Sequence, residues 1–180
     1  MTPREAMDGY VDRYDLSRRS RISHFRPAAF VLVPLAAILF QIYIPRFSEG
    51  ARYLELPLLV TVYFSLMRRA PLVGTLFGCA VGLVQDSLSH HPLGIFGIVK
   101  TLVGYFAASV SLKIDVDNPA VRLVLGGFFF LFHQFFYGVL VRALLAQDLP
   151  FELTQMLALA VLNAAVALPL FALFDKLKVK

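Results

Sequence analysis

The chain has 180 residues, of which 58% are hydrophobic and 16% are charged. Soluble domains are usually about 45–50% apolar and about 25% charged, and a small domain leaves much of its surface in water. The excess apolar surface therefore faces lipid. The single cysteine, Cys79, excludes a disulfide framework. The net charge of +5 comes from basic residues beside apolar runs, which argues against nucleic acid as a partner.

The chain begins with a polar tail, residues 1–26, that carries six arginines. A cleavable signal peptide has a short basic region, a short apolar stretch and a small-residue cleavage site, and this segment lacks that pattern. We expect a cytoplasmic basic tail, then a six-helix transmembrane domain at 27–176 and a short cytoplasmic tail at 177–180. Residues 16–26 contain only basic charges, so the tail either rests on anionic headgroups or binds a partner.

Six apolar runs follow the tail, and each is predicted to cross the bilayer as a helix of about 20 residues. In chain order the runs are Pro27–Ile44, Tyr53–Met67, Pro71–Val84, Leu93–Leu112, Ala120–Leu145 and Phe151–Phe174. The second and third are short and are divided by Arg68 and Arg69, so they form either two short spans or one re-entrant hairpin. We favour two spans, because adjacent arginines are costly at membrane depth and Pro71 suits a first helical turn. Kinks are expected at Pro34, Pro57 and Pro169.

The basic residues are distributed unevenly between the two sides of this predicted topology. With the N-terminus inside, the inner segments hold the six tail arginines and seven more basic residues, namely Arg68, Arg69, Lys113, Arg122, Lys176, Lys178 and Lys180. Arg46 and Arg52 fall outside. The positive-inside rule then predicts an even number of spans with both termini in the cytoplasm. Four spans with a buried hairpin would satisfy the same rule.

Three glycines in the third run, Gly74, Gly78 and Gly82, recur every four residues. In lipid such spacing lets two helix backbones approach closely, either within the protein or with a partner's helix. Asp86 extends the same helical face by one more turn. Its carboxylate is either solvated, or caps the next helix, or holds a fixed partner, which a buried carboxylate requires.

Four polar residues lie within the predicted spans, where polar groups are costly and tend to face protein or water. They are Lys100 in the fourth run, His133 and Gln134 in the fifth, and Asn163 in the sixth. Lys100 lies about 12 Å along its helix from the start at Leu93, which is a long way for snorkelling, so an inward-facing lysine is favoured. Each residue either makes an interhelical hydrogen bond or contributes to one polar cavity.

The sequence contains no recognisable catalytic set. A Gly-Xaa-Ser-Xaa-Gly elbow, a phosphate-binding glycine loop and a His-Glu-Xaa-Xaa-His motif are all absent. His90 and His91 are adjacent, which is poor spacing for two metal ligands on one helix face. We therefore expect neither a metal, nor a cofactor, nor an enzymatic activity.

The middle of the chain, at about residues 68–105, carries a recognisable arrangement. Gly82-Leu83-Val84-Gln85-Asp86 is followed by Pro92-Leu93-Gly94 and later by Gly104-Tyr105. This arrangement resembles the family of the rod shape-determining protein MreD, a small polytopic protein of the bacterial cell-elongation machinery. Asp86, Pro92, Gly94 and Tyr105 fit the family-like stretch, and the resemblance transfers no catalytic role.

The resemblance implies an all-α bundle of six transmembrane helices that is similar to the substrate-binding subunit of energy-coupling-factor transporters. It also implies the bacterial inner membrane, MreC as partner, and the RodA glycosyltransferase with its class B penicillin-binding protein in the same complex. Two hypotheses follow. The chain is a non-enzymatic scaffold that supports peptidoglycan synthesis and cell shape. Alternatively, it is a small-molecule or lipid-binding transporter subunit whose pocket is lined by Lys100, His133, Gln134 and Asn163.

Overall fold

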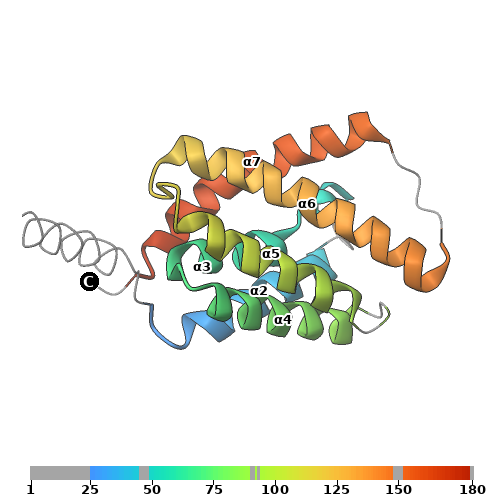
Figure 1. The fold of residues 1–180 in the computed structure, drawn as a ribbon, viewed down its shortest axis with the longest axis horizontal. Helices are drawn as coiled ribbons and strands as arrows, with labels where there is room; N and C mark the ends of the chain where they lie inside the picture. The colour runs from blue at the N-terminus through green and yellow to red at the C-terminus, as the bar shows by residue number, and fades with distance from the viewer. Residues whose placement is uncertain (1–24, 45–48, 90–91, 93, 148–151, 179–180) are drawn as a thin grey trace, which may run out of the picture.

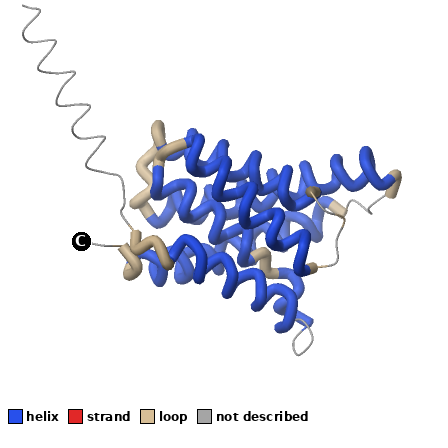
Figure 2. Tube along the Cα trace, turned by 90° about the horizontal axis from the view of Figure 1, so that it is seen from below, coloured by secondary structure: helices blue, strands red, loops and turns tan. Residues whose placement is uncertain are grey.

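The computed structural model describes residues 25–44, 49–89, 92, 94–147 and 152–178. Within these residues the chain forms six α-helices and one 3-10 turn. These are α2 (Ala29–Tyr43), η2 (Glu49–Tyr53), α3 (Leu56–Arg68), α4 (Pro71–Leu88), α5 (Ile95–Ser111), α6 (Pro119–Leu145) and α7 (Leu153–Asp175). Figure 1 shows α6 and α7 along one side of the bundle and α4 along the opposite side. The axes of the helices are broadly aligned with one another (Figure 2).

Helix α3 lies at the centre of this bundle. Every residue from Pro57 to Met67 is buried, and α3 contacts each of the other five helices. Its aromatic residues Tyr63 and Phe64 pack against Phe171 and Phe174 of α7, and Phe64 also packs against Phe30 of α2. At 1.5 Å per residue its 13 residues extend for only about 20 Å, less than a hydrocarbon core of about 30 Å. The other helices therefore shield a central helix that is too short to span alone.

The outer helices are apolar and expose large side chains on their outer faces. Three of them, α4, α6 and α7, are long and apolar enough to cross a bilayer, and α2 and α5 are shorter apolar helices. Large apolar side chains point outward, among them Leu72, Val124 and Val161, which are 72%, 67% and 70% exposed. Because such a surface is solvated by lipid and not by water, the predicted fold class, an all-α membrane helical bundle, is confirmed. Six crossings remain a prediction.

Several predicted boundaries shift in the structure. The chain breaks at Arg68 and Arg69 as expected, and Arg69 ends α3 in the left-handed conformation. Pro57, however, lies in the first turn of α3, so the kink predicted there is wrong. Helix α4 continues one turn beyond the predicted end at Val84, because Gln85 and Asp86 are buried against the bundle. The polar tail at 1–24 and the pair His90 and His91 lie outside the described residues.

Candidate functional site

The glycines of α4 form a close seam with α5. A Cβ atom built on Gly74, Gly78 or Gly82 would collide with a backbone carbonyl of α5. The carbonyls belong to Gly104, Lys100 and Phe96, which are also spaced by four residues. Gly104 is the matching glycine of α5, because its own Cβ would meet the carbonyl of Gly74. We call these four glycines the glycine seam.

The glycine seam faces inward and is covered by α5. Of the two alternatives that the sequence left open, contact within the protein is therefore the one observed for these glycines. Two backbones at this distance leave no room for a third helix, since even a methyl group does not fit. Contact with a partner would have to use another face of α4. The outward face carries Leu72, Leu76 and Leu83, which are 72%, 63% and 44% exposed.

Asp86 caps the N-terminus of α5 from the end of α4. Its carboxylate accepts hydrogen bonds from the backbone N–H groups of Gly94 at 2.9 Å, Phe96 at 3.1 Å and Gly97 at 3.0 Å. The first N–H groups of a helix have no partner within it, and the positive end of its dipole favours an anion. Gly94 adopts φ +102°, a conformation that glycine reaches at little cost. The family-like motif from Asp86 to Gly94 therefore builds the α4–α5 turn, in which Pro92 is exposed.

Lys100 lies beneath this turn and points into the protein. Its side chain is fully buried, and its Nζ lies 3.4 Å from Nε2 of His133 on α6 and 4.4 Å from the centre of the Phe96 ring. The rings of Phe96, His133 and Tyr137 stack nearly parallel. An ammonium over an aromatic face is attracted by the ring quadrupole, which compensates part of the cost of burial.

Two carboxylates complete a buried polar cluster around this lysine. Glu55, which precedes α3, and Asp86, near the end of α4, are close enough to influence the charge of Lys100, but among the described residues neither forms an ion pair with it. We call Glu55, Asp86, Lys100 and His133 the polar cluster. It joins residues of α4, α5 and α6 with the residue that precedes α3, so it forms where four segments meet. Sequence analysis missed Glu55, because it read that residue as part of a span.

The remaining polar residues of the spans lie apart from Lys100 and His133. Asn163 accepts a hydrogen bond from the N–H of Glu55 at 2.9 Å and donates to the carbonyls of Tyr53 and Leu159. It therefore fixes the start of α3 to α7 and reaches the polar cluster only through the backbone of Glu55. Gln134 is half-buried and makes no hydrogen bond with the described residues. Tyr105 is 47% exposed and packs edge-to-face on its neighbour Phe106.

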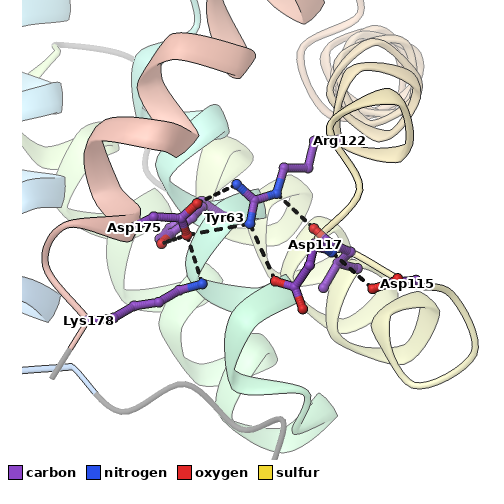
Figure 3. A network of polar contacts seen from close by, with 7 residues as sticks. Tyr63, Asp115, Asp117, Arg122, Asp175 and Lys178 are labelled. Atoms are coloured by element: carbon purple, nitrogen blue, oxygen red, sulfur yellow. Dashed lines mark hydrogen bonds and ion pairs between the residues drawn. The ribbon is translucent and has the colours of Figure 1, made fainter. Parts of the chain in front are cut away.

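A second polar network lies at the opposite end of the bundle (Figure 3). Arg122 of α6 donates to both carboxylate oxygens of Asp175 of α7, at 2.5 and 3.4 Å, and to the carbonyl of Val116 at 2.7 Å. Tyr63 of α3 and Lys178 also bind Asp175, each at 2.8 Å. We call Tyr63, Arg122, Asp175 and Lys178 the Arg122 network. Sequence analysis counted Arg122 only as an inside charge, although the predicted topology already put it on the same side as Asp175.

Taken together, these features describe a polytopic α-helical membrane protein whose helices are joined by backbone contact and buried polar groups. The family model described as rod shape-determining protein MreD matches residues 23–179, nearly the whole chain. The chain belongs to this family, and is thus a rod shape-determining membrane protein, as the arrangement around Asp86 predicted. Comparisons with curated proteins and with solved structures gave no match, so the likeness to energy-coupling-factor subunits stays a prediction.

Proposed function

We propose that this protein is a non-enzymatic scaffold of the bacterial elongation complex, which binds MreC in the inner membrane and supports peptidoglycan synthesis. The observation that carries the proposal is the family match over residues 23–179. The RodA glycosyltransferase and its class B penicillin-binding protein belong to the same complex. Both termini lie in the cytoplasm, in keeping with the positive-inside rule.

The packing of α4 suggests how such a scaffold presents itself to a partner helix. The glycine seam holds α4 against α5, and Asp86 ties the end of α4 to the start of α5. A helix fixed in this way loses little freedom when a partner binds, which favours affinity. We therefore assign MreC binding to the outward face of α4 around Leu72, Leu76 and Leu83, and not to the glycines.

Co-purification with MreC from native membranes in mild detergent tests this assignment. Leu76→Trp enlarges a side chain that is 63% exposed, so the fold can accommodate it. We expect recovery of MreC to fall about tenfold, which corresponds to about 1.4 kcal/mol at a central interface position. Val161→Trp on α7 is the matched control, because Val161 is 70% exposed on a different helix. Equal recovery of MreC with both variants would exclude α4 as the docking face. Failure of the wild-type protein to recover MreC would exclude MreC as a partner.

The alternative function, a ligand-binding subunit of a transporter, receives less support from the geometry. Its pocket required Lys100, His133, Gln134 and Asn163 to share one space. Lys100 and His133 do meet, but the Asn163 amide is engaged at the start of α3. Native mass spectrometry of the purified protein distinguishes the two functions, since a transporter subunit would retain a vitamin-like ligand whose binding is lost in Lys100→Met.

A further inference from the structure

A groove between α2 and α7 is used neither by the polar cluster nor by the proposed docking face. It has a volume of about 500 Å³, and its walls are apolar side chains, among them Leu32, Ala36, Phe40, Leu170 and Leu173. Val60 of the central helix forms its floor. The volume lies within the range of about 300–1,000 Å³ that is typical of sites for small molecules.

A second hollow, which has a different chemical character, adjoins the groove. This hollow has a volume of about 580 Å³ and is lined by Arg26, Lys176 and Lys178. The two hollows adjoin, because they share the lining residues Leu32, Val33, Lys176 and Leu177. The described residues that line them include three basic side chains and no acidic one.

Local contacts hold these basic residues together. An isolated antiparallel bridge pairs Phe25 with Lys178, which puts the chain before α2 beside the chain after α7. Arg26 directly follows that bridge. Asp175 contacts one of these basic residues, since its carboxylate lies 2.8 Å from Lys178. The same carboxylate is also bound by Arg122, so it only partly neutralises Lys178. The basic end of the groove therefore keeps a positive surplus.

We propose that these two adjoining hollows together bind an anionic phospholipid, with an acyl chain in the groove between α2 and α7 and the phosphate at Arg26, Lys176 and Lys178. An acyl chain gains by contact with apolar walls, and basic side chains at the membrane surface attract anionic headgroups. Positive residues mark the cytoplasmic side, so the lipid belongs to the cytoplasmic leaflet. The site lies apart from the proposed MreC face and does not depend on it.

Native mass spectrometry of the full-length protein in detergent tests the proposal, with phosphatidylglycerol and phosphatidylcholine of identical chains as probes. We expect phosphatidylglycerol to be retained preferentially. Arg26→Gln with Lys176→Gln should weaken its retention by roughly fivefold for each charge removed. Lys113→Gln is the matched control, because Lys113 is an exposed lysine at the same end of the bundle that lines neither hollow.

The acyl-chain part of the proposal has its own pair of variants. Ala36→Phe should fill the groove and reduce retention severalfold, whereas Val31→Phe, on an exposed position of α2 outside the groove, should not. Three results would overturn the proposal: equal retention of both lipids, equal loss with Lys113→Gln, or displacement of phosphatidylglycerol by the same concentration of water-soluble glycerophosphate, which would indicate a simple anion site. MreC recovery from the same variants should be unchanged.

Discussion

The Arg122 network and the polar cluster each contain a cation and carboxylates, but they differ in how many hydrogen bonds those groups make. In the Arg122 network, the guanidinium has three acceptors at 2.5, 3.4 and 2.7 Å, and Asp175 receives donors from Arg122, Tyr63 and Lys178. In the polar cluster, Lys100 has one contact to a nitrogen, at 3.4 Å. Two atoms of the polar cluster, Glu55 Oε2 and His133 Nδ1, are buried without a hydrogen-bond partner among the described residues. The other such atoms, Ser65 Oγ, Arg68 Nε, Arg69 Nε and Gln85 Oε1, belong to neither network.

The Arg122 network is therefore a fully paired structural contact, which we call the lock, whereas the polar cluster contains buried polar atoms without a hydrogen-bond partner. Buried polar groups are normally paired, and a fully paired network stabilises one arrangement of the helices around it. The Arg122 network therefore joins α3, α6 and α7 firmly. The polar cluster lacks that saturation, apart from the carboxylate of Asp86, so the effects of substitution should differ between the two ends.

Arg122→Met should have the largest effect on stability. It leaves Asp175 without its main partner and the Val116 carbonyl without a donor, which costs about 2–3 kcal/mol after allowance for the partial exposure of Asp175. Thermal unfolding in detergent should show a marked fall in melting temperature. Lys113→Met, which removes an exposed cation at the same end, should leave it unchanged. Equal melting temperatures for the two variants would contradict the lock.

Gly78→Ala should be the next most damaging, because it acts on the backbone that carries Lys100. The added methyl group meets the Lys100 carbonyl, and overpacking of this kind costs about 1–3 kcal/mol. Gly138→Ala is the matched control, since a Cβ there has nothing within 4 Å, and alanine should stabilise α6 by about 0.5–1 kcal/mol. The two melting temperatures should therefore move in opposite directions, and a shift in the same direction would mean that α4 and α5 separate easily.

Asp86→Ala should cost about 0.5–2 kcal/mol, the usual range for loss of a helix cap. The loss is expected because three N–H groups of α5 lose their acceptor. Glu152 is the N-cap residue of α7, but its side chain makes no capping bond, so Glu152→Ala serves as the control. Similar unfolding curves for both variants would show that the Asp86 carboxylate does not support the turn.

Lys100→Met should have the smallest effect, within about 1 kcal/mol of the wild type. Burial of an ammonium group that makes only one long contact, to a nitrogen at 3.4 Å, carries a desolvation cost, and methionine, which is apolar and of similar volume, removes that cost. The same unfolding assay applies, with Arg122→Met as the reference. A loss as large as that of Arg122→Met would show that Lys100 holds a saturated ion pair and would abolish the contrast between the two ends.

The fold class and the close helix packing at the glycines could be anticipated from the sequence because both depend on local regularities, although the sequence left open which helix the glycines contact. Apolar runs of helical length are recognisable one at a time, and the spacing of Gly74, Gly78 and Gly82 appears within a single helix. The turn that is built by Asp86 and Gly94 is also local, so the family-like motif could be recognised there. The central position of α3 could not be predicted, because its short apolar run resembles a weak span.

The contacts between distant segments were the part that sequence patterns did not reveal. Arg122 and Asp175 are 53 residues apart, and Asn163 and Glu55 are 108 apart. Each residue has an ordinary interpretation by itself, as an inside charge, a helix end or a polar residue in a span. Only the three-dimensional arrangement shows that Asn163 fixes the start of α3 instead of joining Lys100 and His133.

Site-specific photocrosslinking in native membranes tests most directly the claim that α4 turns its glycines inward and offers its outer face to MreC. A photoreactive side chain at Leu76 should crosslink to MreC, whereas the same group at Val161 of α7 should react with lipid alone. Crosslinking to MreC from Val161 but not from Leu76 would contradict the claim.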